Sequence, residues 1–191
     1  MNRRELRREL MSRRKLITPD AARQAGRQAS RNAWSLQVLQ RANRIAAYFP
    51  MGGEVDCQAL IEQAWRRGRE VYLPVLHGDR LRFRQYTAAT RMVLNRFRIP
   101  EPTGGTELPA TAIDVAIAPL VGFDLAGNRL GMGGGFYDRS FRFLKQRKRW
   151  RRPRLVGFAY ELQCLTAIDT CAWDVPLDAA VTESANYVFG L

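Results

Sequence analysis

The sequence is poor in several residue types that define particular classes of protein. It contains three cysteines, Cys57, Cys164 and Cys171, with no C-x-x-C pair, and this odd number argues against a disulfide framework and against a zinc site. It contains one histidine, His77, and no evident Ser-His or Cys-His pairing. The cysteine pattern therefore predicts a protein of a reducing compartment.

Long apolar runs are also missing. The first ten residues, MNRRELRREL, are charged where a signal peptide would be apolar. No stretch approaches the roughly 18 consecutive apolar residues that a transmembrane helix needs. We expect a soluble protein of the cytoplasm with no membrane partner.

Lysine is scarce, although the chain is strongly basic. Lys15, Lys145 and Lys148 are the only lysines among 31 basic residues, so arginine carries nearly all of the formal net charge of +13. The planar guanidinium group suits bidentate binding of phosphates and carboxylates. Two kinds of partner fit this charge, a nucleic acid or a small polyanionic substrate, and composition does not separate them.

The pattern of apolar residues predicts one α/β domain over residues 1–191. The expected helices span residues 3–16, 19–41 and 56–68, and the expected strands span residues 44–49, 70–74, 81–86, 113–118 and 155–159. Residues 99–112 are rich in Pro, Gly and Thr, and are expected to form a long surface loop. Because strands and helices alternate, we expect a doubly wound, largely parallel sheet flanked by helices, a Rossmann-like three-layer sandwich.

The most informative segment is glycine-rich and reads RLGMGGGFYDR from Arg129 to Arg139. It lies between a predicted strand and a helix, at the end of the sheet where open α/β proteins bind ligands. Glycines allow the backbone to approach a ligand closely, and free N–H groups there would hold an anion such as a phosphate. The segment is not a Walker A loop, because no Gly-Lys-Ser/Thr follows, and Phe136 occupies the place of the third glycine of the dinucleotide motif. A plain flexible turn is the alternative interpretation.

Two roles are open to Asp138, which ends this segment. It can cap the following helix. Beside a phosphate site, its carboxylate is also the kind of oxygen ligand that Mg²⁺ prefers. The two roles are compatible.

The segment RLGMGGGFYDR resembles the signature of the 5-formyltetrahydrofolate cyclo-ligases. Three further stretches are similar to that family in the same order. They are Arg3–Arg7, with arginine in place of the first lysine of a K-x-x-L-R pattern, Phe49–Leu76 with its acidic Glu54 and Asp56, and the closing WDVPLD (Trp173–Asp178) and VTE (Val181–Glu183). The resemblance covers almost the whole chain.

This resemblance implies conversion of 5-formyltetrahydrofolate and ATP to 5,10-methenyltetrahydrofolate, ADP and phosphate with Mg²⁺. In the family chemistry the formyl oxygen is phosphorylated and N10 of the folate closes the ring, so no catalytic side chain is implied. The implied ATP contacts are Arg3, Arg4, Glu5, Leu6, Arg7, Arg129, Leu130, Gly131, Met132, Gly133, Gly134, Gly135, Phe136 and Tyr137. The implied folate contacts are Phe49, Glu54, Met132, Gly133, Gly134, Gly135 and Phe136, and the implied Mg²⁺ ligands are Asp138 and Asp174.

The chain departs from the family pattern at two of these positions. Arg3 replaces the usual lysine, which keeps the charge but changes its geometry. Gly134 stands where some members carry a lysine, so one charge that would neutralise phosphate is missing or comes from elsewhere.

A second basic feature is the run from Arg139 to Arg154. Its functional interpretation is a nucleic-acid patch, but we favour a solvated helix face packed through Phe141, Phe143 and Leu144. We therefore expect a monomer whose partner is the small folate, including polyglutamated forms that an arginine-rich surface would attract. The alternative, a basic nucleic-acid-binding module, would lose affinity steeply with salt and turn over no nucleotide.

Overall fold

The computed structural model describes residues 2–147 and 152–190 of the chain. Within these residues, eight strands form one sheet in the order β13-β12-β10-β7-β1-β2-β3-β6. The strands are β1 (Arg44–Ala46), β2 (Glu70–His77), β3 (Arg80–Tyr86), β6 (Glu107–Leu108), β7 (Val115–Pro119), β10 (Arg154–Phe158), β12 (Ala179–Val181) and β13 (Asn186–Val188). From β12 to β2 neighbouring strands are parallel, whereas β3, β6 and β13 pair antiparallel at the edges. The predicted doubly wound, largely parallel sheet is confirmed.

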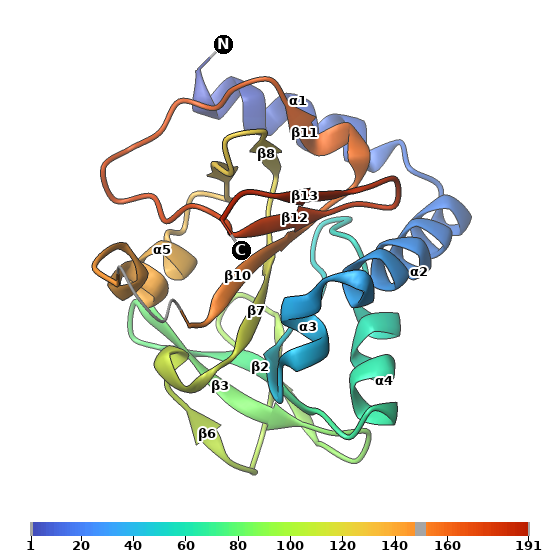
Figure 1. Ribbon diagram of the computed structural model, residues 1–191, viewed down its shortest axis with the longest axis vertical. Helices are drawn as coiled ribbons and strands as arrows, with labels where there is room; N and C mark the ends of the chain where they lie inside the picture. Colours follow the sequence, from blue (N-terminus) through green and yellow to red (C-terminus); the bar gives the residue numbers. More distant parts are fainter. Residues whose placement is uncertain (1, 148–151, 191) are drawn as a thin grey trace.

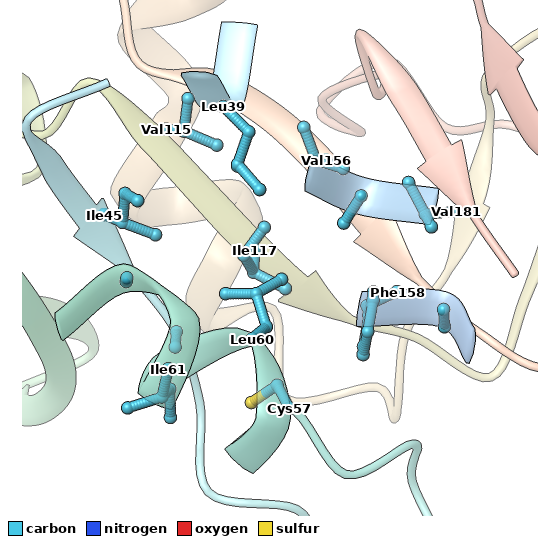
Figure 2. Close-up of a cluster of buried hydrophobic side chains, with 14 of the residues drawn as sticks. Leu39, Ile45, Cys57, Leu60, Ile61, Val115, Ile117, Val156, Phe158 and Val181 are labelled. Carbon is cyan, nitrogen blue, oxygen red and sulfur yellow. The ribbon is translucent and has the colours of Figure 1, made fainter. Parts of the chain in front are cut away.

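Helices cover both faces of this sheet (Figure 1). One face carries α2 (Pro19–Ser35), α3 (Gln37–Arg41) and α4 (Gln58–Arg66), and the other carries α5 (Phe136–Phe141). The central strand β7 shows why both faces are apolar, because alternate side chains pack into opposite layers. Val115 and Ile117 pack in the first layer with Leu60 (Figure 2), whereas Ala116 and Ala118 pack in the second.

The single helix expected over residues 19–41 is two helices. α2 begins as expected, since the Thr18 hydroxyl accepts a hydrogen bond from the Ala21 N–H and Pro19 opens the first turn. The helix ends at Ser35, because Leu36 has an extended backbone, and α3 follows directly. This break buries both Leu36 and Leu39 in the core, so tertiary packing overrides the local helical pattern.

Strand ends also differ from expectation. β1 ends at Ala46, three residues early, whereas β2 continues to His77 because it pairs with β3 along its whole length. Residues 99–112, predicted to form a long surface loop, also contain short regular elements. They contain β5 (Pro100–Pro102), which pairs with β4 (Met92–Leu94), the strand β6 and the 3₁₀ turn η1 (Ala110–Ala112).

A small second sheet lies beside the main one and supports the glycine-rich segment. It joins β11 (Cys164–Leu165), β8 (Gly122–Asp124) and β9 (Arg129–Leu130) in that order. Since β9 consists of the first two residues of RLGMGGGFYDR, hydrogen bonds fix the start of this segment.

The first helix, α1 (Arg3–Lys15), lies across the carboxyl ends of the parallel strands, at the top of Figure 1. Its Leu6 and Leu10 are buried against Val121, Leu130 and Ile168 of the small sheet and its surroundings. Arg14 is buried too, and donates a hydrogen bond of 2.6 Å to the Gly52 carbonyl. These anchors hold the helix in place over the end of the sheet where ligands bind in this architecture.

The basic run from Arg139 to Arg154 lies partly outside the described residues, which omit 148–151. Before this gap it forms α5 and the 3₁₀ turn η2 (Arg142–Lys145), with Phe141 and Leu144 buried and Phe143 packed beside them. The described part therefore agrees with a helical segment packed through these three side chains. Among the described residues no helix has the length and apolar character that crossing a bilayer requires.

Gly26 sets the distance between α2 and the segment that precedes α4. A Cβ added there would lie 2.8 Å from the Asp56 carbonyl oxygen, a backbone atom that cannot turn aside. We expect Gly26→Ala to lower the free energy of unfolding by about 1–3 kcal/mol, although alanine favours helices. Urea denaturation would measure this, with the exposed Gln24→Ala of the same helix as control. A more stable Gly26→Ala protein would contradict the prediction.

Candidate functional site

The glycine-rich loop emerges from β9 and leads into α5. Gly133 and Gly135 have φ of +101° and +66°, a backbone conformation that favours glycine over other residues. Met132, Gly133 and Gly134 are exposed, so this part of the loop is open to a ligand. The structure thus agrees with an accessible backbone surface at the carboxyl end of the sheet.

Helix α1 contacts this loop directly. The Arg7 Nε donates a hydrogen bond of 2.7 Å to the Gly131 carbonyl. Its guanidinium carbon lies 3.9 Å from where a Cβ on Gly133 would sit. The two segments expected to hold the triphosphate, Arg3–Arg7 and the loop, are therefore neighbours although more than 120 residues separate them.

Two arginine–carboxylate pairs lie beside the loop. Arg3 and Asp174 are joined by a contact of 2.6 Å, and Arg129 and Asp138 by another of 2.6 Å. Asp138 also acts electrostatically on Arg3, and Asp174 acts on Arg129. The four side chains form one cluster of two positive and two negative charges.

Backbone groups complete the hydrogen bonding of this cluster. Asp174 accepts a bond of 2.9 Å from the Cys171 N–H, and Asp138 accepts one of 3.1 Å from the Val175 N–H. Arg129 donates to the Val175 carbonyl as well. The segment from Cys171 to Val175 is thereby attached to both the start of α1 and the glycine-rich loop.

Burial and charge shift the pKa values of the cluster in opposite directions. Burial disfavours the charged form of Asp174, but the hydrogen bonds from Arg3 and the Cys171 N–H outweigh it and lower the pKa of this carboxyl. Burial lowers the pKa of the Arg129 guanidinium, against the opposing charge of Asp138. Only 3% of the Arg129 side chain is exposed, compared with 23% for Asp138. The lowered pKa keeps the Asp174 carboxyl charged at neutral pH, so it is available to a cation.

The residues present fit a magnesium ion that is bound by protein carboxylates and substrate phosphates together. The Asp138 Oδ2 and the Asp174 Oδ1 accept no hydrogen bond from any described residue, so each carboxylate keeps one oxygen for another partner. Within residues 2–147 and 152–190 no group of three or more His, Cys, Asp or Glu side chains forms a metal site by itself. Mg²⁺ is commonly held by one or two carboxylates together with substrate phosphates, and this donor set matches that pattern.

Two of the residues expected to bind the folate, Phe49 and Glu54, lie between β1 and α4, and the other five, Met132 to Phe136, lie in the glycine-rich segment. Phe49 is 39% exposed and lines a pocket of about 180 Å³ with Tyr48, Asp56 and Tyr86 among its walls. Glu54 accepts a hydrogen bond of 3.0 Å from the Met51 N–H. Burial raises the pKa of the Glu54 carboxyl, as desolvation does for an acid with few partners.

Several of the expected ATP contacts do not present their side chains to a ligand. Leu6 and Leu130 are buried in the core, which leaves only their backbone for contacts. Glu5 closes the capping box of α1 with Asn2, and the Arg129 guanidinium turns inward to Asp138. Arg4 is exposed to solvent.

Two residues near the site were not singled out from the sequence. Arg139 donates a hydrogen bond of 2.7 Å to the Gly134 carbonyl, and its guanidinium lies 5.2 Å from the centre of the Phe136 ring. Phe97, half-exposed between β4 and β5, meets Phe136 edge-on with the ring centres 5.8 Å apart. Arg139 was visible in the motif, but Phe97 lies in a different part of the chain and no local signal connects it with the loop.

Comparisons with known proteins identify the family. The sequence model of the 5-formyltetrahydrofolate cyclo-ligase family matches residues 1–183. The chain is 39% identical over 182 residues to the 5-formyltetrahydrofolate cyclo-ligase of Escherichia coli K12, which covers 92% of this chain and 97% of the relative. It is 38% identical over 182 residues to the protein of the same name from Haemophilus influenzae, covering 92% and 94% of the two chains.

Solved structures show the same relationship. The structure of 5,10-methenyltetrahydrofolate synthetase from Aquifex aeolicus superposes with a TM-score of 0.84 at 30% identity, and the match covers 99% of this chain and 93% of that one. A synthetase of the same name from Mycoplasma pneumoniae, 23% identical, shares the fold with a TM-score of 0.75 and covers 96% and 99% of the chains.

Proposed function

Since this chain belongs to the 5-formyltetrahydrofolate cyclo-ligase family, we propose that it converts 5-formyltetrahydrofolate and ATP to 5,10-methenyltetrahydrofolate, ADP and phosphate, with Mg²⁺. The observation that supports this most is the convergence of three distant segments. The start of α1, the glycine-rich loop and the Cys171–Val175 segment bring arginines, free backbone and carboxylates to one place. Such a set suits a magnesium nucleotide.

The proposed reaction has two steps. The formyl oxygen attacks the γ-phosphorus of ATP, the bond to the bridging oxygen breaks, and ADP leaves with that electron pair. N10 of the folate then attacks the activated formyl carbon and loses its proton. Phosphate leaves with the C–O bonding electrons, and the carbon remains between N5 and N10 as the methenyl bridge.

Positioning and charge neutralisation are the tasks left to the protein. We assign the triphosphate to Arg7 and to the open backbone of Gly131–Gly135, whose N–H groups suit phosphate oxygens. When bound, Mg²⁺ would neutralise phosphate charge during transfer. Asp138 and Asp174 would hold it through the oxygens that have no hydrogen bond, as described above.

We assign the folate to Phe49 and Glu54 together with the exposed part of the glycine-rich loop. The Glu54 carboxylate would accept hydrogen bonds from the pterin N–H groups, and the exposed Met132 and partly exposed Phe136 would line the path to the formyl group. Phe97 adds an aromatic wall beside Phe136. Aromatic side chains favour the flat rings of such a substrate.

No side-chain nucleophile is needed, and Cys57 is a poor candidate for one. Its thiol is fully buried and donates to the Tyr48 carbonyl. Burial raises the pKa of this thiol to about 12, so it is uncharged at neutral pH. This agrees with a reaction in which the substrate supplies the attacking nitrogen.

A substrate assay tests the proposal. The purified protein is given 5-formyltetrahydrofolate with ATP and Mg²⁺, with either one omitted in parallel reactions, and the near-ultraviolet absorbance of the methenyl product is followed. We expect product only in the complete mixture. A folded protein that forms none would refute the proposal, and a salt-sensitive affinity for nucleic acid without turnover would favour the alternative module.

Arg7 supplies a prediction within this proposal. Arg7→Ala removes a guanidinium held against the loop by the Gly131 carbonyl. We expect the KM for ATP to rise by about 10- to 100-fold, in line with the loss of one charge-assisted contact. Arg8→Ala, an exposed arginine of the same helix, is the matched control because it changes the net charge equally. Equal effects of both variants would assign the change to overall charge instead.

A further inference from the structure

Tyr137 carries a buried hydroxyl that has no hydrogen-bond partner among the described residues. Its ring is held in place, because it stacks on Phe141 with the ring centres 5.8 Å apart and the planes 29° apart. Phe141 is itself fully buried and packs on Phe83. This packing holds the hydroxyl away from solvent, and leaving a buried donor unpaired destabilises a protein.

The surroundings of this hydroxyl belong to the proposed folate side of the loop. Glu54, Cys57 and Tyr48 are close enough to interact electrostatically with it. The hydroxyl of Tyr48 and the thiol of Cys57 already donate hydrogen bonds to backbone carbonyls. Tyr48 donates to the Val55 carbonyl at 2.7 Å, and the Cys57 thiol donates to the Tyr48 carbonyl at 2.9 Å. Tyr137 is thus the member of this group whose donor is unused.

Glu54 closes an exposed turn between β1 and α4. Met51, Gly52 and Gly53 are exposed, and both glycines have positive φ, +55° and +78°. The Glu54 carboxylate would accept hydrogen bonds from N–H groups of the pterin ring. Next to these N–H groups the ring presents a carbonyl oxygen. A hydroxyl donor beside Glu54 complements that edge.

We propose that Tyr137 is a positioning residue for the folate, whose hydroxyl donates a hydrogen bond to the pterin carbonyl beside Glu54. This inference rests on the proposed function. It differs from the role implied by the family resemblance, because it assigns the Tyr137 side chain to the folate and leaves only its backbone for ATP. It also explains why an otherwise paired, buried cluster keeps one polar group unsatisfied.

The test is Tyr137→Phe, which removes the hydroxyl and keeps the stacked ring. Affinity for 5-formyltetrahydrofolate is measured by calorimetry without ATP, affinity for ATP with Mg²⁺ is measured separately, and the Tm is recorded for the free protein. We expect folate affinity to fall about 10-fold, the worth of one hydrogen bond, while ATP affinity stays within about twofold. The free variant should be at least as stable as the wild type, because an unpaired buried hydroxyl is removed.

Tyr72→Phe is the matched control. Its hydroxyl donates to the Glu70 carboxylate at 2.8 Å, near the start of β2 and away from the carboxyl ends of the strands. We expect unchanged affinity for the folate. Parallel losses in both variants would overturn the inference, because they would show a general effect of tyrosine removal.

Three further results would overturn it. If Tyr137→Phe binds the folate with unchanged affinity, the hydroxyl has no role in folate binding. If only the affinity for ATP falls, the hydroxyl contacts the nucleotide instead. A clear fall in the Tm of the free variant would show that the hydroxyl already has a partner. A wild-type protein that binds no 5-formyltetrahydrofolate would instead refute the proposed function, and the inference with it.

Discussion

Asp138→Asn is expected to lower kcat by about 100- to 1,000-fold. Asparagine has the same shape and can still accept hydrogen bonds from Arg129 and the Val175 N–H. It lacks the negative charge that a magnesium ion needs, and the loss of several kcal/mol of charge stabilisation corresponds to a fall of this size. Turnover should be measured over a range of Mg²⁺ concentrations, where we expect a weaker apparent affinity for the metal.

The same substitution is expected to affect stability, because Asp138 is the partner of a buried guanidinium. We expect the free energy of unfolding to fall by about 1–2 kcal/mol, so the assay belongs well below the melting temperature. Asp20→Asn, an exposed carboxylate on α2, is a control for charge. A variant that keeps kcat within threefold and an unchanged dependence on Mg²⁺ would refute the metal role of Asp138.

Arg129→Met is expected to lower the free energy of unfolding by about 2–4 kcal/mol. The Arg129 side chain is 3% exposed and ties Asp138 to the Val175 carbonyl, so methionine would leave a partly buried carboxylate and a carbonyl without their donor. The family resemblance implied that Arg129 contacts the triphosphate. The geometry favours a supporting role, in which Arg129 fixes Asp138 and the Cys171–Val175 segment.

Urea denaturation would measure this loss of stability. Arg23→Met is the control, because Arg23 pairs with Asp20 at a surface where 60% and 91% of the two side chains are exposed, and such pairs contribute less than about 1 kcal/mol. A stable Arg129→Met protein with only a raised KM for ATP would show that Arg129 binds phosphate directly.

Much of the fold follows from short-range patterns. Thr18 and Pro19 start α2 where predicted, and the alternation around Ile117 places one strand at the centre of a sheet that is apolar on both faces. The break at Leu36 was not predictable in this way. Local propensity favours a continuous helix there, and the gain from burying Leu36 and Leu39 decides the outcome.

Some features of the candidate site were likewise predictable from the sequence, and others were not. The glycines of Gly131–Gly135 and the family resemblance located the loop and named Asp138 and Asp174. Neither pattern could show that the Arg129 guanidinium turns inward, that Phe97 stands against Phe136, or that the Tyr137 hydroxyl is left unpaired. These facts depend on which side chains share a space.

The amino-acid sequence alone determined the fold class, the family and the position of the glycine-rich loop, because each follows from the order of residue types along the chain. Only the tertiary structure decided the partner of each charge. Arg3 and Asp174 are 171 residues apart in the chain, yet their side chains are in contact. Contacts at such separations exist only after packing of the sheet and α1 has fixed the backbone, so no local pattern encodes them.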